Sequence, residues 1–233
     1  MKEEAMSQVS LSEDVYRKIR ENIFNGTFSV GMRINEVSLS KDLHVSRTPV
    51  RIALKRIYDE GLLDYSRNQG YRVRVLSAED IDEIFKIRLA LELLAFREAA
   101  NRMTPQDYDH LNEIMEDTAR AIASKDLPQI IEASARFNDA IYAYAQLPRL
   151  SFMVERLKEY LLAFRNVSYK DEESSRRERA FFEHKAIIKS MKEKDFDTLA
   201  LQIEDHLLLA RDYLMSQVSE FKKTHADLFE PYD

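Results

Sequence analysis

The stretch from Val45 to Ile57, VSRTPVRIALKRI, predicts a short helix with two unlike faces. Its apolar residues Val50, Leu54 and Ile57 recur at helical spacing and mark one face. Pro49 falls in the first turn, where the N–H that proline lacks would have no intrahelical partner. We therefore expect a helix that is buried on one side and open to solvent on the other.

The open face of this helix is cationic and begins at a good N-cap residue. In chain order its polar residues are Ser46, Arg47, Thr48, Arg51 and Lys55. A helix N-terminus presents free N–H groups and the positive end of the helix dipole, which favour phosphate. Arginine can also bind a guanine edge through two hydrogen bonds. The helix is therefore predicted to contact DNA, although a basic helix alone would also suit a solvated surface.

The segments on either side of this helix predict a winged helix-turn-helix. Residues 36–43 form a second short helix, and the tight turn at 44–45 links the two helices. Residues 62–65 begin a strand, 67–70 form a hairpin turn, and 71–75 alternate apolar and basic residues as a half-buried strand does. In this arrangement the second helix would enter the major groove.

Specific residues across this region carry a family resemblance. They are Val15-Tyr16 with Ile19-Arg20, Gly26, Gly31-Met32-Arg33-Ile34 with Glu36, the run from Val45 to Arg51, Glu60-Gly61-Leu62-Leu63, and Gly70-Tyr71. On these residues, the segment 11–76 resembles the DNA-binding domain of the GntR family of bacterial transcription regulators. The sequence departs from the family pattern at Ile52, where glutamate is common, and at His44, where glycine is common.

The resemblance implies a homodimer that binds a palindromic double-stranded DNA operator, as a repressor or an activator. Base or near-base contacts are expected from Arg47, Thr48 and Arg51, phosphate contacts from Arg33, Ser46 and Lys55, and minor-groove contacts from Gln69 and Gly70 at the tip of the wing. The operator sequence and the regulated genes cannot be read from these residues.

The charge of the chain is divided unequally. The net charge is −6, yet residues 1–76 carry 13 basic and 10 acidic side chains, whereas the remainder carries 22 and 31. This division suits a cationic DNA reader joined to an acidic helical body. The absence of cysteine and of any apolar run near the ~20 residues of a membrane span favours a cytoplasmic protein with no membrane partner. Residues 1–10 are expected to form a flexible tail.

Residues 77–225 predict an all-α antiparallel bundle, which makes the fold mainly α. Helix start signals occur at Ser77, Thr104, Asp126, Asp171 and Asp195, and a further helix is expected from Leu150 to about Val167. The first of these helices is expected to bury several apolar residues, among them Ile81, Ile87 and Leu94.

The bundle resembles the FCD effector domain of the FadR-type branch of the same family. The matching residues are Arg88 with Glu92, Phe137-Asn138 with Ile141, Glu183-His184 with Ile187, and Asp205-His206-Leu207. The resemblance implies a site in the bundle centre for one divalent metal ion, zinc or nickel, with Asn138, His184 and His206 as ligands. Ser134 stands where the family often has an aspartate ligand.

Two interpretations of this bundle site stay open. In the first, the metal binds and water or a carboxylate of the effector completes its ligand shell, because two imidazoles and an amide are a sparse set. In the second, Arg88, Asn138, His184 and His206 bind a small organic acid directly, without a metal. Arg88 could instead form a plain helix pair with Glu92.

The residues do not predict an enzyme. Glu183-His184 lacks the spacing of a di-iron bundle motif, and neither a glycine-rich phosphate loop nor a nucleophile constellation is present in the sequence. The remaining alternative is a DNA-binding regulator whose bundle only dimerises. Against it, burying His184, His206 and Asn138 would destabilise the fold unless these groups are hydrogen-bonded or used.

Overall fold

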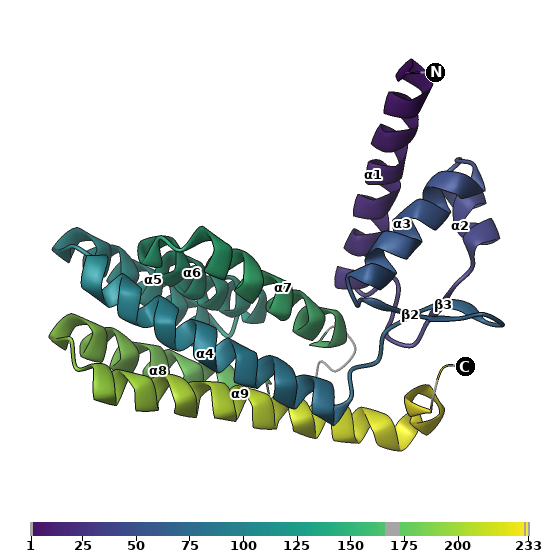
Figure 1. Ribbon diagram of the computed structural model, residues 1–233. Coiled ribbons are helices and arrows are strands. Elements are labelled where there is room, and N and C mark those ends of the chain that lie inside the picture. The colour runs from purple at the N-terminus through teal and green to yellow at the C-terminus, as the bar shows by residue number, and fades with distance from the viewer. Residues whose placement is uncertain (1, 166–172, 231, 233) are drawn as a thin grey trace. The chain divides into compact units, whose positions relative to one another are not determined.

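The computed structural model describes residues 2–165, 173–230 and 232 of the chain (Figure 1). The contacts between Cα atoms divide it into two compact units. The first unit contains residues Met1–Ser77, Glu159–Ser168 and Gln217–Asp233, and the second contains Ala78–Lys158 and Tyr169–Ser216. The predicted mainly α fold is confirmed.

The first unit is a winged helix-turn-helix, as predicted. Its helices are α1 (Lys2–Phe24), α2 (Glu36–Asp42) and α3 (Arg47–Asp59), and its strands are β1 (Arg33–Ile34), β2 (Leu63–Ser66) and β3 (Gly70–Val73). The strands form one antiparallel sheet in the order β1-β3-β2. The sequence did not predict β1, which adds a third strand beside the hairpin.

The apolar face of α3 lies at the centre of this unit. Val50, Leu54 and Ile57 are fully buried and pack with residues of α1, α2 and the sheet. A polar network also joins α1 to the end of α3: the Tyr16 hydroxyl donates to Glu60 at 2.6 Å, and Arg20 donates to the same carboxylate. The scaffold therefore holds α3 rigidly from its buried side.

Two local predictions in this unit need correction or explanation. The first helix was expected to begin near Ser12 after a flexible tail, but α1 begins at Lys2. The residues before Ser12 include several strong helix formers and no glycine or proline, so nothing in them ends the helix.

His44 has a φ of 53°, the left-handed conformation that glycine adopts most easily, which explains why glycine suits the turn between α2 and α3.

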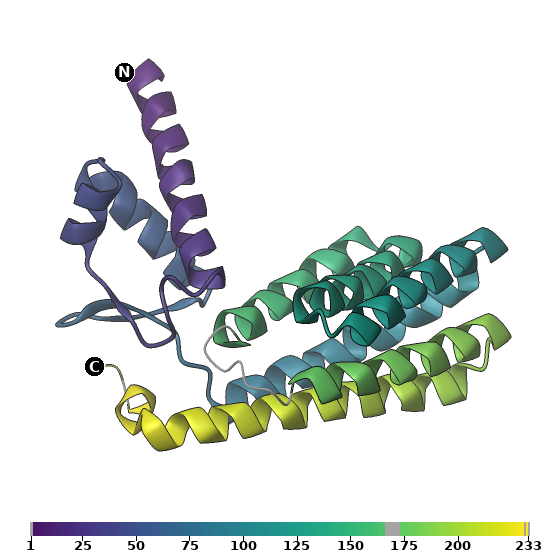
Figure 2. The same ribbon diagram turned by 180° about the vertical axis from the view of Figure 1, so that it is seen from behind.

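The second unit is built from antiparallel helices, as predicted. They are α4 (Ala78–Arg102), α5 (Pro105–Ser124), α6 (Leu127–Ala145), α7 (Pro148–Arg165), α8 (Glu173–Glu193) and α9 (Phe196–Thr224), and the short 3₁₀ helix η1 (Ala226–Phe229) follows. The ends of α7 and α9, together with η1, belong to the first unit. The predicted helix end at Val167 and start at Asp171 lie outside the described residues. Successive helices lie beside one another and run in opposite directions in both ribbon views (Figures 1 and 2).

The predicted start signals of two bundle helices are confirmed in atomic detail. The Thr104 hydroxyl accepts from the Asp107 backbone N–H and the Asp107 carboxylate accepts from the Thr104 N–H, which completes a capping box. Asp126 likewise accepts from the Gln129 N–H. In the described part of the chain, no helix has the length and apolar character needed to cross a bilayer.

The buried core of the bundle differs from the prediction at two positions. Phe137, Ile141 and Ile187 lie inside, as their spacing indicates. Ile87 and Leu94 were expected to be buried, but they expose 42% and 48% of their surface. Both residues lie on the side of α4 away from the core, and their apolar character therefore needs another explanation.

Candidate DNA interface and bundle-core site

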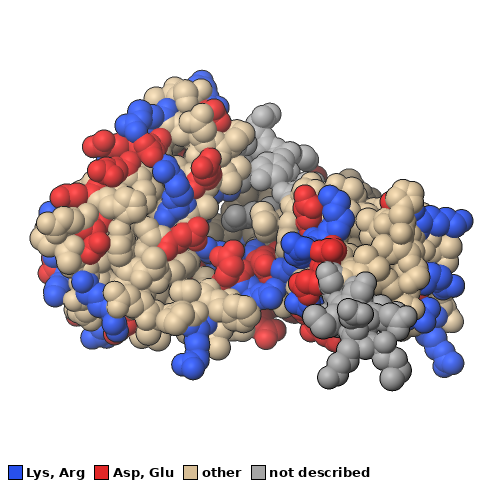
Figure 3. Space-filling model, turned by 90° about the horizontal axis from the view of Figure 1, so that it is seen from above, with Lys and Arg blue, Asp and Glu red and all other residues tan. Residues whose placement is uncertain are grey.

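The cationic residues predicted to contact DNA lie on the exposed face of α3. Arg47, Arg51 and Lys55 expose more than half of each side chain, and Thr48 is exposed beside them. Lys55 pairs with Asp59 on the same helix. Basic side chains project from the outer edge of the winged-helix unit, at the right of Figure 3. The exposed face of α3 is therefore accessible to a binding partner.

Glu36, at the start of α2, holds the two arginines of this face. Its Oε2 atom lies 3.3 Å from Nη2 of Arg51 and 3.8 Å from Nη2 of Arg47. All three side chains are partly open to water, so the pairs add little to stability. They place both guanidinium groups beside one carboxylate.

The N-terminus of α3 is free to bind a phosphate. Ser46 occupies the N-cap position with extended backbone angles, but its hydroxyl caps no helix N–H. The predicted N-cap position is therefore confirmed, whereas a side-chain cap is not formed. The first backbone N–H groups of α3 and the Ser46 hydroxyl all remain available as hydrogen-bond donors.

Arg33 and the wing residues lie on the sheet of the same unit. Arg33 is exposed in β1, opposite Arg72 of β3. Gln69 and Gly70 end the turn between β2 and β3, and Gly70 has a φ of +79°, which favours glycine. The contacts of these residues with DNA stay predictions, because no DNA is present.

In the bundle, the structure brings the two predicted histidines together. His184 of α8 is buried and stacks on Phe137 of α6 with ring centroids 4.0 Å apart, and the His206 ring lies 4.9 Å from it. The Nε2 atom of His184 is buried and has no hydrogen-bond partner. Burial, with help from the neighbouring charges of His206 and Arg176, holds the pKa of His184 well below 6.5 and keeps the ring neutral.

A carboxylate and a buried arginine complete this cluster. Nδ1 of His206 lies 2.6 Å from Oε2 of Glu183. Burial opposes the charge of Glu183, but the hydrogen bond with His206 and the nearby arginines outweigh it and lower its pKa. The Arg176 side chain is 17% exposed, and its Nη1 atom is 3.9 Å from Glu183, beyond hydrogen-bond distance. Burial lowers the pKa of Arg176. We call Arg176, Glu183, His184 and His206 the bundle cluster.

The donor atoms near the bundle cluster fit a metal only in part. Asn138 follows Phe137 on α6 and donates its amide to the Ser134 backbone carbonyl at 3.2 Å, and Ser134 has no carboxylate to offer in place of aspartate. Within the described residues, no three or more His, Asp or Glu side chains form a group that could hold a metal ion. The Glu183–His206 contact does match the way carboxylates orient metal-binding histidines.

Arg88, the other predicted effector residue, is engaged in an ion pair. Its Nε and Nη2 atoms lie 2.9 Å and 2.8 Å from Oε1 of Glu92. The exposed fractions of the two side chains are 11% and 2%. The buried Tyr142 hydroxyl adjoins Glu92, and burial followed by that charge raises the pKa of Tyr142. Effector binding by Arg88 stays a prediction, and a ligand would have to compete with Glu92.

Comparison with family models identifies both parts of the chain. Residues 11–73 match the model of bacterial regulatory proteins of the gntR family, and residues 83–209 match the FCD domain. The chain belongs to the GntR family of transcriptional regulators and carries an FCD domain. These matches confirm the resemblance seen in the sequence and exclude the metalloenzyme interpretation.

Similar proteins agree with this assignment. The regulator YdhC of Bacillus subtilis is 29% identical over 209 residues, which cover 89% of this chain and 92% of YdhC. McbR of Escherichia coli is 34% identical over 152 residues, 65% of this chain and 69% of McbR. The solved structure of E. coli McbR/YncC superposes with a TM-score of 0.70 at 26% identity, covering 89% of this chain and 98% of that one. The gluconate operon repressor of Bacillus licheniformis is 26% identical over 84% of this chain and 82% of its own.

Two members of the bundle cluster were missed as site residues in this GntR-family regulator. Arg176 lies in a run of charged residues that indicates a solvent-exposed start of a helix, and Glu183 was noted only as the neighbour of His184. A helical-spacing test would have helped, because Arg176 and Glu183 are seven residues apart and share one face of α8.

Proposed function

We propose that the protein is a cytoplasmic, effector-responsive repressor that binds a palindromic operator as a homodimer. The observation that carries the DNA-binding part is the arrangement of α3, whose apolar face is fully buried while Arg47, Thr48 and Arg51 are exposed at its N-terminal end. The name of the gluconate operon repressor supports the direction of regulation, since that relative covers most of the chain.

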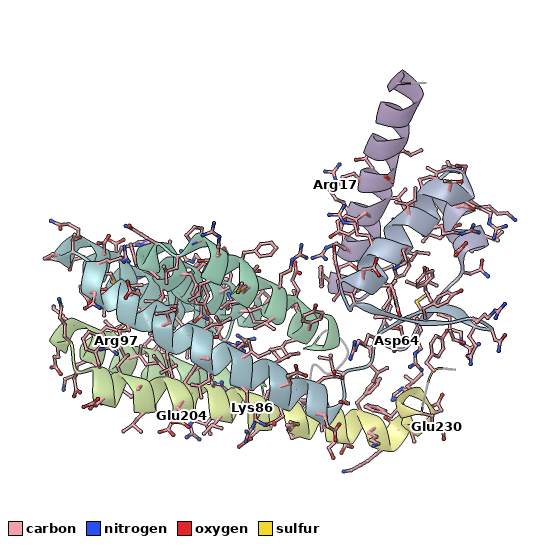
Figure 4. The ribbon with its side chains drawn as sticks, in the orientation of Figure 1. Arg17, Asp64, Lys86, Arg97, Glu204 and Glu230 are labelled. Atoms are coloured by element: carbon pink, nitrogen blue, oxygen red, sulfur yellow. The ribbon has the colours of Figure 1, made fainter. Side chains whose placement is uncertain are left out.

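An exposed stripe on α4 supports self-association. Glu83, Ile87, Ala90, Leu94 and Arg97 recur at helical spacing and all are exposed. If two copies of α4 cross antiparallel near Ala90, Ile87 of one copy faces Leu94 of the other, and Glu83 faces Arg97. The small side chain of Ala90 allows close approach, and the end charges are complementary. Figure 4 labels Arg97 and, about three turns earlier on α4, Lys86.

A twofold dimer implies the form of the operator. An isologous interface uses the same surface on both subunits, so the two α3 helices become related by a twofold axis. Two such readers match two half-sites of inverted sequence. Replacing Ile87 and Leu94 with aspartate should therefore give a monomer in light scattering and weaken operator binding, whereas Phe152→Asp, at a 62% exposed residue of α7, should change neither. A dimer that persists in the double variant would contradict this interface.

The bundle cluster supports a small carboxylate as effector. Arg176 is largely buried without a close hydrogen-bonded carboxylate, and His184 offers an unpartnered Nε2 atom. An organic acid could accept hydrogen bonds from Arg176 and, through one oxygen, from a protonated nitrogen of His206 or His184, with the Asn138 amide nearby on α6. Binding alters DNA affinity only if the ligand favours one dimer arrangement over the other.

A divalent metal is the second candidate for this site. The observation in its favour is the hydrogen bond between Glu183 and His206, which would leave Nε2 of His206 free as a ligand together with Nε2 of His184. Zinc or nickel held by two imidazoles and Asn138 would take a further oxygen ligand from the effector, because Ser134 supplies no carboxylate.

Metal content and ligand response distinguish the two candidates. Elemental mass spectrometry on untagged protein incubated with zinc or nickel should find near-stoichiometric metal for the metal-bound site, and loss of it in a His184→Ala, His206→Ala variant. A metal-free protein whose thermal midpoint rises with small carboxylates, but not in Arg176→Ala, supports direct anion binding. A protein that responds to neither contradicts the effector proposal and favours a bundle that only dimerises.

The DNA-binding proposal is tested by operator selection from random duplexes, followed by titration of variants. Arg51→Ala should weaken binding to the selected site by about 1–3 kcal/mol and relax the preference at one base pair. Arg120→Ala is a matched control, because Arg120 is equally exposed on α5. Equal affinity and specificity of Arg51→Ala and the wild type would remove Arg51 from the interface.

A further inference from the structure

The β2–β3 hairpin has two faces, and the second face is covered unexpectedly. The register pairs Leu63 with Val73 and Asp64 with Arg72, so successive side chains point to opposite sides. Leu63 and Val73 belong to the core beneath α3. Arg72 points to the other face, where a basic residue would be expected in solvent, yet it is only 7% exposed. Something outside the hairpin must cover it.

The cover is the C-terminal end of the chain. The Tyr232 ring lies over the Arg72 guanidinium at 4.1 Å from its centroid, while Asp64 pairs with Arg72 at 3.1 Å. The Tyr232 hydroxyl donates to the Gln69 carbonyl at 3.3 Å, next to the tip of the wing. In both ribbon views η1 lies below the hairpin, and Figure 4 labels Asp64 at the hairpin and Glu230 just after η1.

A second contact fixes the same segment against the start of the sheet. Leu228 of η1 packs on Gly31, which precedes β1 and has a φ of +79°. A Cβ atom at Gly31 would lie 2.5 Å from Cδ1 of Leu228, so a larger residue there would push the Leu228 side chain away and would also be strained by the positive φ. All these residues belong to the first compact unit. The segment therefore touches Gly31, two residues before β1, and Arg72 of β3, the strand that begins at the wing tip.

We propose that η1, with Glu230 and Tyr232 after it, forms a brace that holds the wing in its DNA-binding position, with Tyr232 and Leu228 as positioning residues. A short hairpin has marginal stability by itself, and a mobile wing would lose conformational entropy on every binding event. The brace removes that cost in advance by covering the outer face of the hairpin. This inference rests on the proposed contact of Gln69 and Gly70 with DNA.

The test uses the full chain with a Tyr232→Ala, Leu228→Ala variant and a Tyr232→Phe control. Phenylalanine keeps the ring over Arg72 and removes only the hydroxyl contact with Gln69. The double variant should bind the selected operator about three- to tenfold more weakly, the range expected from a lost cation–π contact and apolar packing. Amide hydrogen exchange should accelerate in Gly70–Val73 but not in the buried face of α3. Tyr232→Phe should stay within about twofold of the wild type.

The outcomes separate the brace from the DNA-binding proposal. Unchanged exchange in Gly70–Val73 in the double variant would overturn the brace, whatever the affinity. Tighter operator binding would overturn it too, because the segment would then obstruct the wing. Faster exchange at the hairpin with no selective DNA binding by the wild type would support the brace and refute the proposed function. Accelerated exchange throughout α3 would mean general unfolding and would also refute a local brace.

Discussion

The Arg88–Glu92 pair gives a sharp prediction about the stability of the bundle. Glu92 is 2% exposed, and its carboxylate accepts a hydrogen bond from Nε of Arg88 and lies 2.8 Å from Nη2 of the same guanidinium. In Arg88→Ala that carboxylate stays buried without its cation. Breaking a buried pair from one side typically costs about 3–5 kcal/mol. The Arg88 guanidinium also lies 4.9 Å from the centroid of Phe85, so some packing is lost as well. We expect a loss of about 4 kcal/mol in the free energy of unfolding.

Two further variants make the reasoning refutable. Urea unfolding followed by circular dichroism at fixed protein concentration gives each free energy, since a dimer's stability depends on concentration. Arg88→Ala with Glu92→Gln should recover more than half of the loss, because no uncompensated charge remains. Arg88→Met with Glu92→Met should lie within about 1.5 kcal/mol of the wild type, as apolar replacements of buried pairs often do. A loss below about 1 kcal/mol in Arg88→Ala would refute a structural pair and strengthen Arg88 as a ligand-binding residue.

Three other predictions follow from single groups. Folding lowers the pKa of His184 from 6.5 and that of Glu183 from 4.5. The free energy of unfolding should therefore be constant above about pH 6.5 and decrease as the pH falls below it, by up to about 1.4 kcal/mol per pH unit for each group. A free energy of unfolding that does not change between pH 7 and pH 4 would contradict this. His44→Gly should raise the free energy of unfolding by about 0.5 kcal/mol, since it relieves the positive φ, and a loss would mean that the His44 side chain contributes elsewhere. Glu36→Gln frees two arginines and removes a negative charge, so it should increase the affinity for random duplex DNA more than the affinity for the operator. Titrations with both duplexes test this, and an equal change in the two affinities would contradict the pairing of Glu36 with the arginines.

Much of the fold could be predicted from the sequence because specific residues mark where its helices begin and end. Thr104 and Asp126 cap their helices with short-range hydrogen bonds, and Gly61 ends α3 in a conformation that glycine favours. These signals act within a few residues, so a local pattern contains them. The amphipathic pattern of α3 is equally local, and its predicted buried and exposed faces are confirmed.

The missed features depend on residues far apart in the chain. Alternation in β3 predicts an exposed Arg72, but Tyr232 covers it from 160 positions away in the sequence. Ile87 and Leu94 were placed in the core because apolar spacing cannot distinguish a buried face from an apolar stripe that stays exposed on the subunit. Arg176 looked like an ordinary surface charge, because only the packing of α8 on its neighbours buries it.

The bundle contains one buried polar pair whose charges are matched and one buried nitrogen that has no partner, and this contrast argues for a ligand. Arg88 and Glu92 pair at 2.8 Å, whereas Nε2 of His184 is buried without a hydrogen-bond partner. Unpartnered buried groups destabilise a fold. His184→Phe should therefore raise the thermal midpoint of the ligand-free protein while it removes the rise caused by the effector, since phenylalanine can also stack on Phe137. A lower midpoint at pH 7 would mean that His184 stabilises the bundle through contacts of its own, and the case for a ligand at this nitrogen would be lost.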